Sequence, residues 1–138
     1  MTAPIPPVDD ATLDELLAAA RTAAHRAYVP YSKFRVGAAV LAADGTVVPG
    51  CNVENASYGL ACCAERTALF SAVASGYREV VALAVTCADG DPTRPDTLMP
   101  CGACRQVMAE LLPRDAPVIV DGVGRYTIDE LLPRAFRL

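Results

Sequence analysis

The chain has 138 residues and a mass of 14.5 kDa, a size that suits one domain with its own hydrophobic core. Apolar residues make up 53% of it and charged residues 20%, which excludes an intrinsically disordered chain. The net charge of −4, without a cluster of Lys and Arg, excludes a nucleic-acid polymer as the expected partner and favours a small uncharged substrate.

The sequence shows no membrane or export signal. No apolar run approaches the roughly 20 residues that cross a bilayer, and the N-terminus MTAPIPPVDD lacks the basic and apolar parts of a signal peptide. We therefore expect a cytoplasmic protein without a membrane partner. Six cysteines in a reducing compartment indicate metal ligation, catalysis or burial rather than a disulfide framework.

The first half of the chain predicts one helix and one hairpin. Residues 1–8 are rich in proline, and we expect them to be loosely ordered. Apolar positions from Asp10 to Ala27 recur at helical spacing, and a proline-containing segment then ends the helix. Two short apolar runs, Val36–Ala42 and Val47–Val53, are separated by a turn-forming tetrapeptide and predict a β-hairpin.

The second half alternates helices and strands. The elements predicted there are a helix at Cys63–Ser75, a buried strand at Val80–Cys87, a helix at Cys101–Leu112, a strand at Pro117–Val120 and a short helix at Ile128–Leu132. We expect residues 1–138 to form a single domain of the α/β class. Its predicted architecture is a three-layer α/β/α sandwich with one mixed central sheet.

Three cysteines stand at the starts of two predicted helices. Cys101 and Cys104 are three residues apart, so both sulfurs lie on one face of the first turn, and Cys63 begins the other helix. Helix N-termini favour thiolates over thiols. Two such ends facing each other would place three thiolates around one Zn²⁺ per chain. The open fourth position is typical of a catalytic zinc site rather than a structural one.

Two residues beside Cys63 complete the predicted chemistry. Glu65 is too close in sequence to Cys63 to be a comfortable fellow ligand, and it is placed to carry protons as a general acid and base. Three thiolates leave a zinc centre negatively charged, so a cation should draw charge off the sulfurs. Arg66 and Arg105 are the candidates, and we favour Arg66.

Together these residues form the pattern C-x-E followed by P-C-x-x-C, which resembles the signature of zinc-dependent deaminases in its three-cysteine form. From about Asp14 to Phe136 the chain is similar to the small cytidine deaminases that act on free nucleosides. The segments that carry the resemblance are YVPYSKF at 28–34, VGA at 36–38, GCNVENASYG at 50–59, CAERT at 63–67, PCGACRQ at 100–106, and LLP at 131–133 with Phe136.

The resemblance implies hydrolysis of cytidine and 2′-deoxycytidine to uridine and 2′-deoxyuridine with release of ammonia, a step of pyrimidine salvage. It implies substrate contacts from six residues: Phe34, Asn52, Glu54, Tyr58, Ala64 and Phe136. It also implies a homotetramer whose active sites are shared between subunits, with Tyr58 and Phe136 acting across the interface.

Several of these residues also fit plainer interpretations. Phe34 suits the hydrophobic core as well as a pocket, and Asn52 and Glu54 are typical of turns and surfaces. Arg35 stands where related sequences often have proline. The remaining cysteines are expected to be small buried apolar residues: Cys51, Cys62 and Cys87.

Two other functions fit parts of the pattern. A related zinc deaminase could act on another cytosine-containing small molecule such as blasticidin S, although the Asn52 and Glu54 pair favours an intact ribose. A non-catalytic zinc-binding protein would need a fourth protein ligand and would have no use for Glu65.

Overall fold

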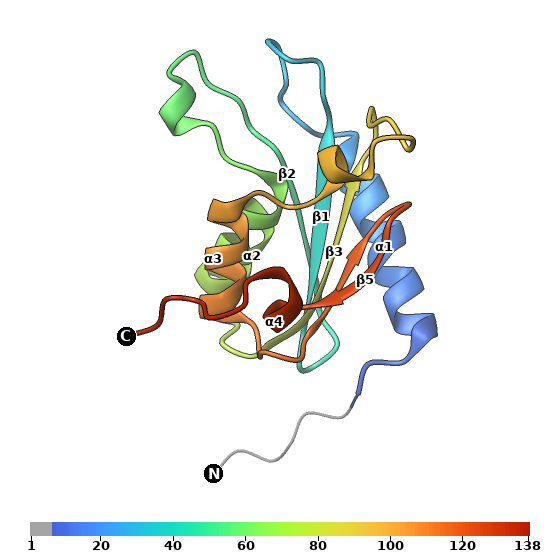
Figure 1. Ribbon diagram of the computed structural model, residues 1–138, viewed down its shortest axis with the longest axis vertical. Coiled ribbons are helices and arrows are strands. Elements are labelled where there is room, and N and C mark those ends of the chain that lie inside the picture. The colour runs from blue at the N-terminus through green and yellow to red at the C-terminus, as the bar shows by residue number, and fades with distance from the viewer. Residues whose placement is uncertain (1–6) are drawn as a thin grey trace.

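A computed structural model describes residues 7–138 (Figure 1), so the expected loose order of the N-terminus falls largely outside the described residues. One face of a central sheet is covered by α1 (Asp10–Ala24). The other face is covered by α2 (Ala64–Ala74), α3 (Gly102–Leu111) and α4 (Ile128–Leu131). The predicted three-layer α/β/α fold is therefore confirmed. Within residues 7–138, none of the helices has both the length and the apolar character of a membrane span.

The sheet is mixed and has the strand order β2-β1-β3-β4-β5. Its strands are β1 (Val36–Ala42), β2 (Val47–Cys51), β3 (Val80–Cys87), β4 (Pro117–Val120) and β5 (Gly124–Thr127). β1 pairs antiparallel with β2 and with β3, while β3 pairs parallel with β4 and β4 antiparallel with β5. The parallel pair needs a crossover, which α3 provides.

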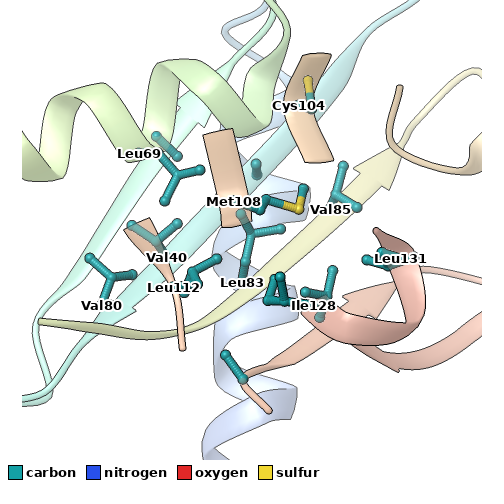
Figure 2. Packing of buried hydrophobic residues seen from close by; sticks show 14 of the residues in the cluster. Val40, Leu69, Val80, Leu83, Val85, Cys104, Met108, Leu112, Ile128 and Leu131 are labelled. Atoms are coloured by element: carbon teal, nitrogen blue, oxygen red, sulfur yellow. The ribbon is translucent and has the colours of Figure 1, made fainter. Parts of the chain in front are cut away.

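Alternate residues of β1 face opposite layers, as the period of a strand requires. Ala38 and Val40 belong to a cluster formed with α2, α3 and α4, whereas Ala39 and Leu41 pack against α1. Figure 2 shows the larger cluster, with Cys104 at one end of the labelled residues. Cys104 is fully buried there, so the first turn of α3 is continuous with the core.

Some boundaries differ from those predicted. The first helix ends at Ala24 instead of Ala27, and β2 ends at Cys51 instead of Val53, which forms isolated bridges outside the strand. The strand β5 is not predicted from the sequence, because Gly-Arg-Tyr-Thr lacks the apolar alternation of a strand. Two short 3₁₀ helices also lie in loops, η1 (Tyr58–Leu60) and η2 (Pro95–Leu98).

Gly50 sets the distance between β2 and α2. A Cβ atom at this position would lie 2.4 Å from the Ala68 nitrogen and 2.8 Å from the Ala64 carbonyl oxygen, both of which are backbone atoms. Backbone atoms cannot turn aside as the end of a flexible side chain can, so the helix lies this close only against glycine. Because α2 begins directly after Cys63, the same contact fixes the first of the three cysteines.

We expect Gly50→Ala to lower the free energy of unfolding by about 1–3 kcal/mol, the range for overpacking a core. Urea unfolding of the variant and the parent measures this difference. Gly59→Ala is the matched control, because a Cβ atom there meets nothing within 4 Å, and its stability should stay within about 0.5 kcal/mol of the parent. Identical unfolding curves for Gly50→Ala and the parent would contradict the close approach of α2.

Candidate metal centre and active site

The three cysteines meet where the N-terminal ends of α2 and α3 face each other. Cys63 is the N-cap of α2 and Cys101 is the N-cap of α3, both with extended backbone. Neither side chain caps its own helix, so both sulfurs are available for other contacts. The Sγ atoms of Cys63 and Cys101 are 4.0 Å apart, and those of Cys101 and Cys104 are 3.4 Å apart.

This spacing fits a tetrahedral zinc ion. Zinc–sulfur bonds of about 2.3 Å at tetrahedral angles put two sulfurs about 3.8 Å apart. These two separations lie on either side of that value, and all three sulfurs lie within 4.8 Å of one another. Among residues 7–138, no fourth His, Cys, Asp or Glu joins this cluster. The set is therefore the three-ligand type that leaves one coordination position for water or substrate.

Arg66 is the cation at the sulfurs. Its Nη2 donates a hydrogen bond to the Cys63 Sγ at 3.3 Å, and this contact raises the pKa of the guanidinium. The neighbouring Cys104 thiol and the Arg66 guanidinium lower the pKa of Cys63 to about 5. The pKa of Cys104 is raised by its contact with Cys63 and by burial. A metal ion that binds here must therefore displace a proton from Cys104.

Arg105 bonds backbone carbonyl groups instead of the sulfurs and fastens the end of α4. Its Nε donates to the Pro100 carbonyl oxygen and its Nη1 to the Leu131 carbonyl oxygen, each at 2.8 Å. The next residue, Gln106, donates from Nε2 to the Phe136 carbonyl oxygen at 2.9 Å. These bonds join the first turns of α3 and the loop before it to the end of α4 and the segment that follows.

Glu65 lies in the first turn of α2 and is only 4% exposed. Burial raises the pKa of its carboxyl group, and the nearby Cys63 thiolate raises it further. A buried carboxyl group of raised pKa beside a metal-binding cysteine cluster has the properties of a general acid and base. Ala64, the first residue of α2, is fully buried, and its N–H has no acceptor within the helix.

Asn52 follows β2 and holds the segment that carries Phe34. Its Nδ2 donates to the Phe34 carbonyl oxygen at 2.8 Å, and its Oδ1 accepts from the Val36 N–H at 2.9 Å. Its own backbone N–H donates to the Val36 carbonyl oxygen at 3.2 Å. Asn52 therefore fixes the backbone on both sides of Arg35, where the chain enters β1. Phe34 itself is partly buried.

Glu54 holds the preceding part of the same loop. Its Oε1 accepts from the backbone N–H groups of Tyr31 and Ser32, each at 3.1 Å, and its Oε2 accepts from the Ser32 hydroxyl. The hydrogen bond from the Ser32 hydroxyl is the main reason that the pKa of Glu54 is lowered. Glu54 also lines a pocket of about 290 Å³ together with Tyr31, Ser32, Asn55, Tyr58 and Ala61.

A backbone bridge joins this loop region to the metal cluster. Val53 donates to the Cys62 carbonyl oxygen at 3.0 Å and accepts from the Cys62 N–H at 2.9 Å. Asn52 and Glu54 flank Val53, and Cys63 follows Cys62, so the bridge places the polar pair next to the first metal-binding residue.

Two of the expected substrate-contacting residues lie at the surface. Tyr58 is 82% exposed at the start of η1, and Phe136 is 70% exposed in the segment after α4. Figure 1 shows the loop that carries η1 projecting from the same end of the sheet as the loop between α1 and β1. Neither aromatic ring is covered by residues 7–138.

Two contacts near the site were not predicted from the sequence. The first is the contact of Ser32 with Glu54. The second is a bidentate pair in which Arg35 donates from Nε at 2.9 Å and from Nη2 at 2.8 Å to Asp89. The Arg35 backbone N–H also donates to Asp89, and Arg35 lowers the pKa of that carboxyl to about 2. The pair ties the Phe34 segment to the loop after β3, over a separation of 54 residues.

The other three cysteines, Cys51, Cys62 and Cys87, lie outside the metal cluster and are partly buried. Burial raises the pKa of the Cys87 thiol to about 11 and also raises the pKa of Cys51. Both groups therefore remain thiols at neutral pH.

Comparison with known proteins gives consistent results over most of the chain. The model of the family described as the cytidine and deoxycytidylate deaminase zinc-binding region matches residues 10–120. The cytidine deaminase of Halalkalibacterium halodurans is 57% identical over 114 residues, which cover 80% of this chain and 83% of that protein. The crystal structure of cytidine deaminase from Burkholderia pseudomallei has a TM-score of 0.79 and 50% identity, covering 89% of this chain and 98% of that one.

The cytidine deaminase structure from Mycobacterium tuberculosis has a TM-score of 0.81 at 42% identity, covering 96% of this chain and 100% of that one. The matched region of the family model spans the three cysteines, Glu65 and Arg66. Sequence, fold and metal cluster agree, and the chain belongs to the cytidine and deoxycytidylate deaminase family, the proteins that share this zinc-binding region.

Proposed function

We propose that this protein is a zinc-dependent cytidine deaminase. It hydrolyses cytidine and 2′-deoxycytidine to uridine and 2′-deoxyuridine with release of ammonia, as a single catalytic domain in cytoplasmic pyrimidine salvage. The observation that carries this proposal is a buried carboxyl group, Glu65, beside three cysteine sulfurs at zinc-binding distances. The family match and the relatives named cytidine deaminase support the same reaction.

In this proposal Cys63, Cys101 and Cys104 hold one zinc ion per chain, and Arg66 offsets part of their negative charge. A zinc ion held there would lower the pKa of a water molecule and so ready it for attack on C4 of the cytosine ring. Glu65 accepts a proton from that water and delivers it to N3 of the ring. Glu65 then takes the remaining proton from the new hydroxyl group at C4 and passes it to the amine, which leaves as ammonia while the oxygen remains as the carbonyl.

The free hydrogen-bonding groups of Asn52 and Glu54 support a substrate with an intact ribose. One amide N–H of Asn52 is used by Phe34, which leaves the other free. A carboxylate has about four acceptor positions, and the three bonds from Tyr31 and Ser32 leave one on the Oε2 of Glu54. A ribose hydroxyl can accept from the free N–H and donate to the free oxygen position.

Other contacts in the proposal come from the residues that flank these groups. Phe34 supplies an apolar wall for the base, and the N–H of Ala64 at the start of α2 is a free donor near the ring. Two different functions predict other behaviour. A blasticidin S deaminase would turn over that compound faster than cytidine, and a structural zinc protein would turn over neither. Rates with cytidine, cytosine and blasticidin S therefore separate these possibilities.

The proton-carrying role of Glu65 gives the sharpest test of the mechanism. Glu65→Gln keeps the size of the side chain and its hydrogen-bonding reach but cannot move protons. We expect it to retain zinc and cytidine binding while kcat falls by ~10²–10⁴-fold or more, because one residue serves several proton transfers. Cys62→Ala is the control and should change kcat little. Turnover by Glu65→Gln within about threefold of the parent would show that another group carries the protons.

The metal assignment is tested by elemental analysis. We expect about one zinc ion per chain in the parent and loss of both zinc and activity in Cys101→Ala, because two thiolates do not hold a tetrahedral ion as three do. Cys101 is the best position for this change, since its side chain is exposed and its loss leaves the core intact. Cys51→Ala, outside the cluster, should keep its zinc. Full activity in metal-free protein would refute the proposal.

We further propose a homotetramer in which Tyr58 and Phe136 reach the active sites of neighbouring subunits. The exposure of Tyr58, Leu60, Phe70 and Phe136 supports an interface, because large apolar side chains at a surface mark contact sites. A largely apolar pocket of about 540 Å³ beside Phe70 extends that surface between α2 and α3. Closed symmetric assemblies of identical chains are the commonest oligomers.

Light scattering should give a mass of about 58 kDa, four times that of the 14.5 kDa chain. Phe70→Asp places a charge in the proposed interface, and we expect it to produce smaller species with reduced activity. Ala18→Asp adds the same charge on an exposed part of α1, on the other side of the sheet, and should leave the tetramer intact. A parent that is monomeric and fully active would rule out shared sites.

A further inference from the structure

The Ser32 hydroxyl lies between two parts of the proposed substrate site. It donates a hydrogen bond to the Oε2 of Glu54, the oxygen that keeps a free acceptor position. The same hydroxyl oxygen accepts from the backbone N–H of Phe34 at 3.0 Å. One small side chain therefore contacts both the group proposed to bind ribose and the residue proposed to line the base pocket.

The backbone at this point needs support from such contacts. Lys33, between Ser32 and Phe34, has a φ of 60°, in the left-handed region that non-glycine residues rarely adopt. The Lys33 N–H donates to the Val29 carbonyl oxygen at 3.1 Å, which closes the turn on one side. The bond from the Phe34 N–H to the Ser32 hydroxyl closes it on the other. Without that hydroxyl, the turn loses the contact that directs the chain into Phe34.

The far side of Phe34 is held by the second member of the polar pair. The Nδ2 of Asn52 donates to the Phe34 carbonyl oxygen at 2.8 Å. The N–H of Phe34 thus depends on Ser32 and Glu54, and its carbonyl group depends on Asn52. Hydrogen bonds therefore connect the backbone of Phe34 to both proposed ribose-binding residues, to Glu54 through Ser32 and to Asn52 directly.

We propose that Ser32 is a positioning residue that orients the Glu54 carboxylate and the Phe34 segment together, so that the ribose and base subsites form as one unit. This inference rests on the proposed function. Ser32 acts through its neighbours, since the proton-carrying Glu65 and the cysteine cluster belong to other elements. Loss of its hydroxyl should therefore affect substrate binding much more than the chemical step.

The test compares Ser32→Ala, Ser32→Thr and the parent with cytidine as substrate. We expect Ser32→Ala to raise KM about tenfold or more, as for the loss of a hydrogen bond to a charged group, with kcat within about threefold of the parent. Ser32→Thr keeps the hydroxyl and should restore most of the lost affinity. Ser75→Ala removes an exposed hydroxyl at the end of α2 and is the matched control, with parental KM.

A double-mutant cycle with Glu54→Gln identifies the route of the effect. If Ser32 acts through Glu54, Ser32→Ala should raise KM much less in the Glu54→Gln background than in the parent. Zinc content and thermal midpoint, measured for every variant, show whether the fold is kept. A loss of zinc, or a fall of kcat in parallel with the rise in KM, would mean a general structural role and would overturn the proposal.

The remaining outcomes separate this inference from the function on which it rests. A parent that does not deaminate cytidine refutes the proposed function and this inference together. An active parent whose Ser32→Ala variant keeps KM within about twofold refutes only the role of Ser32. A Ser32→Thr variant that is as impaired as Ser32→Ala also refutes it, because the hydroxyl would then not be the group that matters.

Discussion

The approach of two helix N-termini is the constraint on which the rest of the site depends. Cys63 and Cys101 are the N-cap residues of α2 and α3. Their sulfurs lie 4.0 Å apart, a distance at which two thiolates would repel each other. Three features offset this repulsion: the positive ends of both helices, the guanidinium of Arg66, and the divalent ion that the cluster fits. The close contact at Gly50 holds α2 where this balance is possible.

The loop regions around the cluster combine binding and support in the same side chains. Asn52 and Glu54 are the proposed ribose contacts, yet their side chains also hold the backbone from Tyr31 to Val36 through four hydrogen bonds. Such shared use keeps the free donor and acceptor pre-oriented, because each group is fixed by bonds that exist without substrate. The cost is that neither residue can be changed without disturbing the loop.

Much of the fold and the metal cluster could be predicted from residue patterns, because both depend on local spacing. The sequence itself contains the helical periodicity, the hairpin turn and the C-x-E and C-x-x-C intervals. The strand β5 was not visible, since its pairing with β4 and not its composition makes it a strand. Sequence alone left Arg66 and Arg105 as alternatives, because only the folded structure shows that Arg105 bonds the backbone at Pro100 and at the end of α4. The links from Ser32 to Glu54 and from Arg35 to Asp89 join segments far apart in the chain, which no local pattern encodes.

The hydrogen bonds of Arg105 also determine which amino-acid substitutions this part of the protein can tolerate. Both of its acceptors are peptide carbonyl groups, at Pro100 and Leu131, and every amino acid offers the same oxygen at those places. Substitutions at the two acceptor positions can therefore preserve the link as long as the backbone keeps its course. Only the arginine itself is chemically required, since its planar fork supplies both donors. The link between the metal-binding loop and the end of α4 thus depends on one side chain, while the buried Leu131 and the proposed substrate contact Phe136 stay constrained by their own roles.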